Sequence, residues 1–294
     1  MALPPTYLAD RAKCVDKALD QFLPRATVKP VTIHKAMRYS LFAGGKRLRP
    51  ILALAAAEAC GGSIEKALPA ACAVECIHTY SLVHDDLPCM DDDDLRRGRP
   101  TSHKVFGDGI AVLAGDALLT IAFEILAQAE ATPRYKTAAL IRELADASGS
   151  RWLIAGQVLD LESEGKPITR EQLKFIHRAK TAALLTSSIR LGAMSANATE
   201  ARLKNLTDFG QALGLAFQII DDILDVTQTT EKLGKTAGKD VQAVKATYPA
   251  IFGLEPSRKE AHRLTNAAMA ALAPFGEKGA ALHSLADHLL AREY

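Results

Sequence analysis

Residues Ile110 to Ala129 read IAVLAGDALLTIAFEILAQA, and this stretch decides the fold class. Its apolar side chains recur at spacings of three and four residues, the period of an α-helix, and they occupy more than one face. A helix of that kind lies at the centre of a bundle or at a subunit interface. We therefore expect a helical bundle, and the excess of apolar surface predicts a homodimer. Asp116 and Glu124 interrupt the stretch, so we do not expect it to cross a bilayer, which needs roughly 20 apolar residues.

The helical period recurs through most of the chain, and no stretch alternates apolar and polar residues as a half-buried strand does. A first helix is predicted from Ile33 to the glycine pair Gly44–Gly45. Further helices are predicted over residues 50–60, 65–87, 110–130, 135–160, 169–196, 200–227, 256–273 and 277–292, with breaks at glycines and prolines. No long polar linker divides them. We predict an all-α protein in which residues 1–294 form one domain, a large bundle of long helices.

Composition argues against several classes of function. The 294 residues are 48% hydrophobic and 24% charged, with a formal net charge of +2, so no nucleic-acid partner is indicated and an anion site has to come from local clustering. The five cysteines include no C-x-x-C pair, which indicates neither a disulfide framework nor a structural zinc site. Pro4, Pro5, Asp10 and Asp16 stand where a signal peptide needs an apolar core, so we expect a cytoplasmic protein.

Two acidic clusters each follow an apolar helical segment. The second, Asp221-Asp222-Ile223-Leu224-Asp225, places Asp221 and Asp225 one turn apart on one face of a helix. Like charges at this spacing destabilise a helix slightly, and Mg²⁺ binds one or two carboxylates while leaving positions for phosphate oxygens. One such cluster could equally be a solvated helix end, but two together favour metal binding.

The first cluster reads Asp85-Asp86-Leu87-Pro88-Cys89-Met90-Asp91, followed by Asp92, Asp93 and Asp94. Asp85 and Asp91 would point in different directions on a regular helix. Pro88 cannot continue a helix, so we expect a kink or an end there, a distortion that allows Asp91 to return toward Asp85. The three following aspartates are either solvated or support the metal ligands.

Basic residues lie around both acidic clusters. They are Lys46 and Arg49 beside the glycine pair, Arg96 and Arg97 after the first cluster, Lys180 in an apolar helix, and Lys235, Lys239 and Lys245 after the second cluster. Arginine and lysine are the usual partners of phosphate oxygens. Acids that can hold a metal, with bases at both ends, predict a site for two diphosphates.

These motifs resemble those of trans-prenyl diphosphate synthases. His84 to Asp91 with Arg96 to Thr101 resemble the first aspartate-rich motif of that family, Phe217 to Asp225 the second, and Gly44 to Pro50 its isopentenyl-diphosphate loop. Gly115–Asp116 and Gly234–Lys235 also fit, and the matches run from about residue 33 to residue 254. The first motif carries an insertion similar to that of bacterial farnesyl diphosphate synthases and plant-type geranylgeranyl diphosphate synthases.

The resemblance implies the isoprenoid synthase fold, a helical bundle around a central cavity, as a homodimer. It implies that the allylic diphosphate is held through Mg²⁺, as three ions with substrate bound, by Asp85, Asp86, Asp91, Asp221 and Asp225, with Arg96, Lys180, Lys235 and Lys245. Isopentenyl diphosphate would be held without metal by Lys46, Arg49, His78 and Arg97. Thr181 and Gln218 would face the developing carbocation. The role of Lys239 stays open, and His78 could otherwise be an ordinary buried histidine.

The activity so implied is the head-to-tail condensation of isopentenyl diphosphate with dimethylallyl or geranyl diphosphate to farnesyl diphosphate. Tyr80, five residues before Asp85, would form the floor of the chain tunnel beside the small Ser81, unless it is simply a packed tyrosine. Two alternatives remain open, a geranylgeranyl diphosphate synthase with the same sites and a noncatalytic partner subunit. A terpene cyclase would have no need of Lys46 and Arg49.

Overall fold

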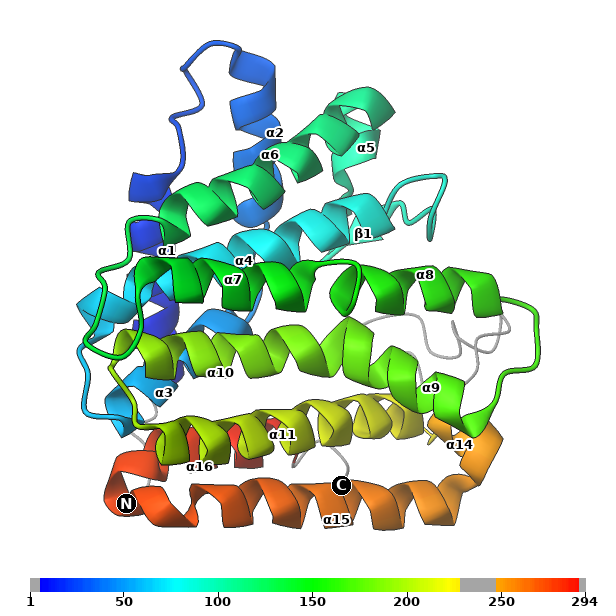
Figure 1. Ribbon diagram of the computed structural model, residues 1–294. Helices are drawn as coiled ribbons and strands as arrows, with labels where there is room; N and C mark the ends of the chain where they lie inside the picture. The colour runs from blue at the N-terminus through cyan, green and yellow to red at the C-terminus, as the bar shows by residue number, and fades with distance from the viewer. Residues whose placement is uncertain (1–5, 228–246, 291–294) are drawn as a thin grey trace. The chain divides into compact units, whose positions relative to one another are not determined.

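The computed structural model describes residues 6–227 and 247–290 (Figure 1). The chain divides into two compact units. We call Leu3–Arg142 with Leu191–Ala198 the N-terminal unit, and Glu143–Arg190 with Thr199–Tyr294 the C-terminal unit. Lys235, Lys239 and Lys245, which the sequence singles out, lie outside the described residues.

The N-terminal unit is built of helices and one short hairpin. Its elements are α1 (Tyr7–Phe22), α2 (Val31–Leu41), α3 (Leu48–Ala59), α4 (Ile64–Asp85), β1 (Leu95–Arg96), β2 (Arg99–Pro100), α5 (Ser102–Phe106) and α6 (Asp108–Leu126). Helix α4 packs against both α3 and α6, and the alanine-rich run from Ile51 to Ala57 on α3 is fully buried. Small side chains let these helices approach closely, because a Cβ on Gly115 of α6 would lie 2.0 Å from His84 Nε2 on α4.

Two helices contribute residues to both units, α7 (Thr137–Ser148) and α10 (Ala183–Ser195). The remaining elements of the C-terminal unit are α8 (Leu153–Ser163), α9 (Arg170–Ile176), the π-helical turn η1 (His177–Ala182), α11 (Glu200–Thr227), α14 (Tyr248–Phe252), α15 (Leu254–Leu272), the 3₁₀ segment η2 (Ala273–Gly279) and α16 (Ala280–Leu290). Helix α11 packs along α15 and against η1. Gly214 permits the second contact, since a Cβ there would come within 2.7 Å of Ala182.

The predicted helices are confirmed in outline, with local corrections. The segment predicted as one helix over 135–160 is divided into α7 and α8, and α1 was not expected. The antiparallel pair β1–β2 was also missed, because two-residue strands are too short to show a period. Its turn residues Arg97 and Gly98 both have positive φ, 55° and 73°, as a tight two-residue hairpin requires.

By length and composition alone, α6 could cross a membrane, despite its three acidic residues, Asp108, Asp116 and Glu124. It is the one described helix of which this is true. In this fold α6 packs on α4, α2 and α5. Val112 and Leu113 remain exposed on its surface, at 39% and 54%.

Candidate active site

The first acidic cluster forms a loop that closes on itself at the end of α4. The helix ends at Asp85, and the backbone N–H of Asp91 donates to the carbonyl oxygen of Asp85 at 2.9 Å. The N–H of Asp93 likewise donates to the carbonyl of Asp86 at 3.2 Å. The six-residue spacing is thus compensated by the turn around Pro88, and the return of Asp91 toward Asp85 is confirmed for the backbone.

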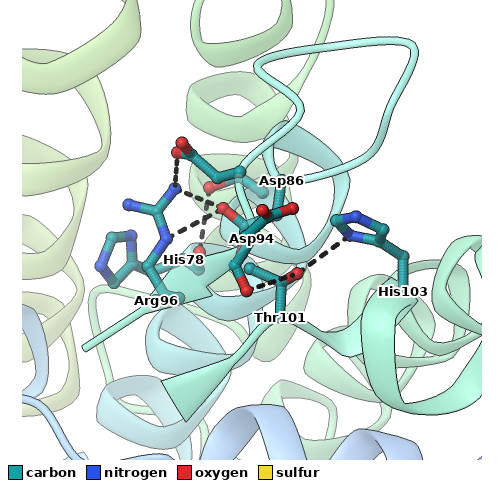
Figure 2. Close-up of polar contacts among 8 residues, drawn as sticks. His78, Asp86, Asp94, Arg96, Thr101 and His103 are labelled. Carbon is teal, nitrogen blue, oxygen red and sulfur yellow. Dashed lines mark hydrogen bonds and ion pairs between the residues drawn. The ribbon is translucent and has the colours of Figure 1, made fainter. Parts of the chain in front are cut away.

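Asp86 is held by Arg96 of strand β1 (Figure 2). Arg96 Nε donates to Asp86 Oδ1 at 2.9 Å, Nη2 contacts the same oxygen, and Nη2 also lies 3.3 Å from Asp93 Oδ2. Asp86 is buried, and this burial raises the pKa of its carboxyl although Arg96 opposes the shift. One Asp86 oxygen is therefore already committed to a guanidinium.

A second chain of contacts fixes the residues that follow the hairpin (Figure 2). The hydroxyl of Thr101 donates to the carbonyl oxygen of Asp94 at 3.4 Å and lies 3.1 Å from His103 Nδ1. The side chain of Asp94 forms an exposed ion pair with Lys104 at 2.7 Å. Asp94 consequently faces a surface lysine, which fits the solvated interpretation of this aspartate.

A cavity of about 570 Å³ lies in the N-terminal unit; we call it the basic cavity. It brings together all four residues expected to hold the metal-free diphosphate, and its lining is Ala43, Gly44, Gly45, Lys46, Arg47, Leu48, Arg49, Glu75, His78 and Arg97. Arg97 reaches back to the carbonyl oxygen of Gly44. A Cβ on Gly45 would lie 2.4 Å from Arg97 Nη1, so glycine is required for this approach.

The electrostatics of the basic cavity favour an anion. Shielding from solvent, together with the nearby charge of Arg97, lowers the pKa of Arg49 although Glu75 opposes this. Shielding and the arginines likewise lower the pKa of His78 well below its usual range. Arg49 Nε is buried with no hydrogen-bond partner among the described residues. A diphosphate would supply both the missing acceptor and the missing negative charge.

A second cavity, of about 160 Å³, lies in the C-terminal unit and contains three other predicted residues, Lys180, Thr181 and Gln218. Lys180 Nζ donates to Asp160 Oδ2 at 2.6 Å, and the Thr181 hydroxyl donates to Gln218 Oε1 at 2.9 Å. Both Lys180 and Thr181 lie on the π-helical turn η1. Such turns occur frequently at functional sites, because the extra residue re-aims the side chains.

Asp222, one turn after Gln218 on α11, belongs to the same hydrogen-bond network. Its two oxygens accept from Gln218 Nε2 at 3.0 Å and from the backbone N–H of Tyr248 at 2.7 Å, and His177 Nε2 lies 3.3 Å away. With its N–H₂ group held by Asp222, Gln218 presents its oxygen to Thr181. The amide orientation of Gln218 is thereby fixed.

Asp225 provides the test of whether the second cluster fits a metal. It is 5% exposed, and its Oδ2 has no hydrogen-bond partner within the part of the chain that the structure describes. A buried carboxylate oxygen of this kind is a suitable ligand for a hard divalent cation. Among the described residues no three acidic, histidine or cysteine side chains are grouped to hold an ion by themselves. The donors fit Mg²⁺ that is shared with phosphate oxygens, which is how Mg²⁺ is commonly bound.

Sequence reasoning missed Asp160, His177 and Asp222, and it gave no role to Arg47 and Glu75. Asp160 could have been found as the acidic residue in the apolar segment from Leu153 to Leu161. Arg47 and Glu75 carry no local signal, since their pairing joins residues 28 positions apart.

Comparison with known proteins agrees with this arrangement. The family model of polyprenyl synthetase matches residues 30–278. The chain is 52% identical to the heterodimeric geranylgeranyl pyrophosphate synthase large subunit 1, chloroplastic, of Arabidopsis thaliana, over 98% of this chain and 79% of the relative. It is 51% identical to the chloroplastic geranylgeranyl pyrophosphate synthase of Catharanthus roseus, over 98% and 81%. The solved FPP/GFPP synthase of Zymomonas mobilis superimposes with a TM-score of 0.87 at 37% identity, covering 97% and 98% of the two chains.

The fold is that of the isoprenoid synthases, as the resemblance implied. The chain belongs to the polyprenyl synthetase family. It is a prenyltransferase of isoprenoid biosynthesis, and its reaction is the elongation of prenyl diphosphates.

Proposed function

We propose that this chain condenses isopentenyl diphosphate with allylic diphosphates up to the twenty-carbon product, geranylgeranyl diphosphate. Relatives that share about half of its residues over nearly its whole length carry that name. We therefore prefer the twenty-carbon product, which was the alternative at the level of sequence, to the fifteen-carbon farnesyl diphosphate that the sequence led us to expect.

The structural observation that supports a condensation of two diphosphates is the pairing of a basic cavity with an acidic loop along one helix. His78 faces the cavity, and Asp85 ends the same helix two turns later. We assign the basic cavity to isopentenyl diphosphate, which keeps its diphosphate and therefore needs only fixed cations. We assign the acidic residues of both motifs to the allylic diphosphate, which must leave with its charge.

Asp85, Asp91, Asp221 and Asp225 would hold Mg²⁺ against the allylic diphosphate, and Asp86 would support them through Arg96. Mg²⁺, when bound, neutralises charge that grows on the departing diphosphate. Lys180 is held by Asp160 and would contact the same leaving group, while the paired Thr181 and Gln218 would face the allylic cation. The double bond of isopentenyl diphosphate attacks that cation, and the proton then lost passes to the released diphosphate.

A fifteen-carbon product remains the second candidate because of Tyr80. Its side chain is 6% exposed and lies edge-on to His84, with 5.8 Å between the ring centroids. Burial and the charge of Asp85 raise the pKa of Tyr80 to about 12, so the hydroxyl lies within electrostatic reach of the first aspartate. A bulky ring there would limit the growing chain.

We propose further that the protein acts as a single functional domain in a homodimer. The exposed apolar side chains on α6, Val112 and Leu113, support an interface on that helix. One relative is named as a subunit of a heterodimer, so a different partner is the alternative. The retained aspartates in both motifs favour a catalytic role over a purely regulatory one, and a cytoplasmic location stays a prediction.

The decisive experiment is chromatography of products that the purified chain forms alone. It is supplied with isopentenyl diphosphate, Mg²⁺ and dimethylallyl, geranyl or farnesyl diphosphate in separate reactions, with chelator as the control. Geranylgeranyl diphosphate from all three starters is expected. Farnesyl diphosphate as the end product would favour the second candidate, and no product from any starter would indicate a subunit that needs a partner.

A further inference from the structure

Arg47 differs from its neighbours Lys46 and Arg49 in the basic cavity, because its guanidinium is fully engaged with the protein. Nε donates to Asp16 Oδ1 at 2.7 Å, Nη1 to Glu75 Oε1 at 2.8 Å, and Nη2 to the carbonyl oxygen of Leu41 at 2.7 Å. The residue is 3% exposed. Three acceptors on three different segments thus consume its donors, and few remain for a substrate.

Glu75 is the acidic side chain among the residues that line the cavity. It is 1% exposed and lies three residues before His78 on α4. The other charged lining residues are Lys46, Arg47, Arg49 and Arg97, all cationic. The charge of Glu75 acts on Arg47, Arg49 and Arg97 alike. Before a substrate binds, Glu75 therefore offsets a repulsion that would otherwise spread these cations apart.

The backbone at Arg47 explains why the loop needs an anchor. Its φ is 49°, in the left-handed region that non-glycine residues enter at a cost. Its carbonyl oxygen accepts the N–H of Ile51 at 3.0 Å and so begins α3. Because Arg47 lies between Lys46 and Arg49, its fixed conformation sets the directions in which those two side chains leave the backbone.

We propose that Arg47, Glu75 and Asp16 are positioning residues that hold the basic loop in its diphosphate-binding shape before substrate arrives. Glu75 is the resident counter-charge of the cavity, Arg47 is the anchor, and Asp16 ties the anchor to α1. None of the three contacts the diphosphate. This inference rests on the assignment of the basic cavity to isopentenyl diphosphate.

The test replaces the buried pair as a unit. Removing one partner would leave an uncompensated buried charge, whereas apolar residues at both positions are commonly tolerated. We expect Arg47→Met/Glu75→Leu to melt within a few degrees of the wild type. The dissociation constant of isopentenyl diphosphate, measured by calorimetry without allylic substrate, should rise roughly tenfold. The KM of geranyl diphosphate should change less than about twofold, because this substrate does not use the loop. A folded double variant with an unchanged dissociation constant overturns the inference.

Asp16→Asn keeps the test open if the double variant does not fold. The Asp16 side chain is 48% exposed, so its replacement should not unfold the protein. We expect the dissociation constant of isopentenyl diphosphate to rise roughly two- to fivefold. The matched control is Asp20→Asn on the same helix, whose partner Arg38 does not line the cavity. Equal dissociation constants for both variants and the wild type overturn the proposal.

Arg49→Ala separates this inference from the assignment on which it rests. If Arg49→Ala binds isopentenyl diphosphate more weakly while the double variant and Asp16→Asn bind it as the wild type does, the positioning role alone is overturned. If Arg49→Ala also binds isopentenyl diphosphate normally, the assignment of the cavity fails and the inference fails with it.

Discussion

His78 on α4 and Arg49 on α3 face each other in the basic cavity, with 3.3 Å between His78 Nε2 and Arg49 Nη1. An arginine is charged at every relevant pH, so the histidine beside it is stabilised in its neutral form. A neutral imidazole can accept from the guanidinium and leave the remaining Arg49 donors for a ligand. The Arg49–His78 pair therefore contributes one positive charge to the basic cavity rather than two.

This relationship predicts a pH dependence of stability. The pKa of His78 is lower in the folded protein than its unfolded value of about 6.5, so the unfolded chain binds the extra proton first as pH falls. Stability due to this residue is present above about pH 6.5 and is lost below it, by up to about 1.4 kcal/mol per pH unit. Urea unfolding between pH 7 and 5 should give a steeper loss for the wild type than for His78→Gln, with the exposed His288→Gln as control. Equal slopes for wild type and His78→Gln would contradict the prediction.

Arg49→Ala should raise the KM for isopentenyl diphosphate by roughly ten- to a hundredfold, the value of one or two charged hydrogen bonds. The KM for geranyl diphosphate should change far less. Arg99→Ala is the matched control, since Arg99 is exposed and stacks on Tyr39 outside the cavity. Steady-state kinetics with each substrate varied in turn measures the difference. A larger effect on geranyl diphosphate would mean that the two pockets are assigned the wrong way round.

Asp85→Ala, Asp91→Ala and Asp221→Ala should each lower turnover by several orders of magnitude. Each removes a ligand that neutralises the departing diphosphate. Release of diphosphate measures turnover, and circular dichroism checks that helix content is retained. Asp94→Asn, in the same loop but paired with Lys104 at the surface, should stay close to the wild type. Near-normal turnover in Asp85→Ala or Asp221→Ala would rule out a metal site that needs both clusters.

Gly115→Ala should destabilise the protein by about 1–3 kcal/mol, because the new Cβ would collide with the ring of His84, which packs between α4 and α6. Helical Gly→Ala changes are otherwise neutral or favourable by up to about 1 kcal/mol. Gly109→Ala on the same helix is the control, since a Cβ there meets no atom within 4 Å. Chemical denaturation measures both. A Gly115→Ala variant as stable as Gly109→Ala would show that His84 moves aside at little cost.

Tyr80→Ala should lengthen the product if Tyr80 limits the chain. The expected shift is to the next longer diphosphate, whichever product the wild type makes. Tyr80→Phe is the control, because it retains the ring and removes only the hydroxyl. Product chromatography reads the result. An unchanged product in a folded Tyr80→Ala variant would leave Tyr80 as a packed core residue.

The sequence predicts the long helices well, because their apolar spacing alone determines them. Helix α11 has the predicted bounds, and α4 and α6 lie within a few residues of theirs. The break at Gly149–Trp152 was missed although Gly149, Ser150 and Arg151 interrupt the apolar pattern there. Helix α1 was missed although Val15, Leu19 and Phe22 recur at helical spacing. Its long-range contacts through Arg11 and Asp16 carry no local signal.

The candidate active site likewise contains residues that the sequence predicts and residues that it does not. Lys46, Arg49, His78 and Arg97 were named from motifs, and the structure brings them together around one cavity. Asp222 was passed over because a carboxylate between two candidate ligands looks redundant in sequence. Its contact with Gln218 follows the i, i+4 spacing of α11, whereas its contact with the N–H of Tyr248 becomes visible only when α11 and the start of α14 are packed. Contacts between residues that are far apart in the sequence cannot be predicted from local sequence patterns.

The π-helical turn η1 limits which changes of sequence this chain can accept. It contains one residue more than a regular helix would need to cover the same rise. Loss of any single residue from His177 to Ala182 would leave an ordinary helix with its flanks nearly in place, but side chains within the turn would change direction by up to one residue step, about 100°. Lys180 would then point away from Asp160, or Thr181 away from Gln218. A substitution in this turn changes one side chain, whereas a deletion would redirect several at once, so the contacts of Lys180 and Thr181 depend on the length of the turn.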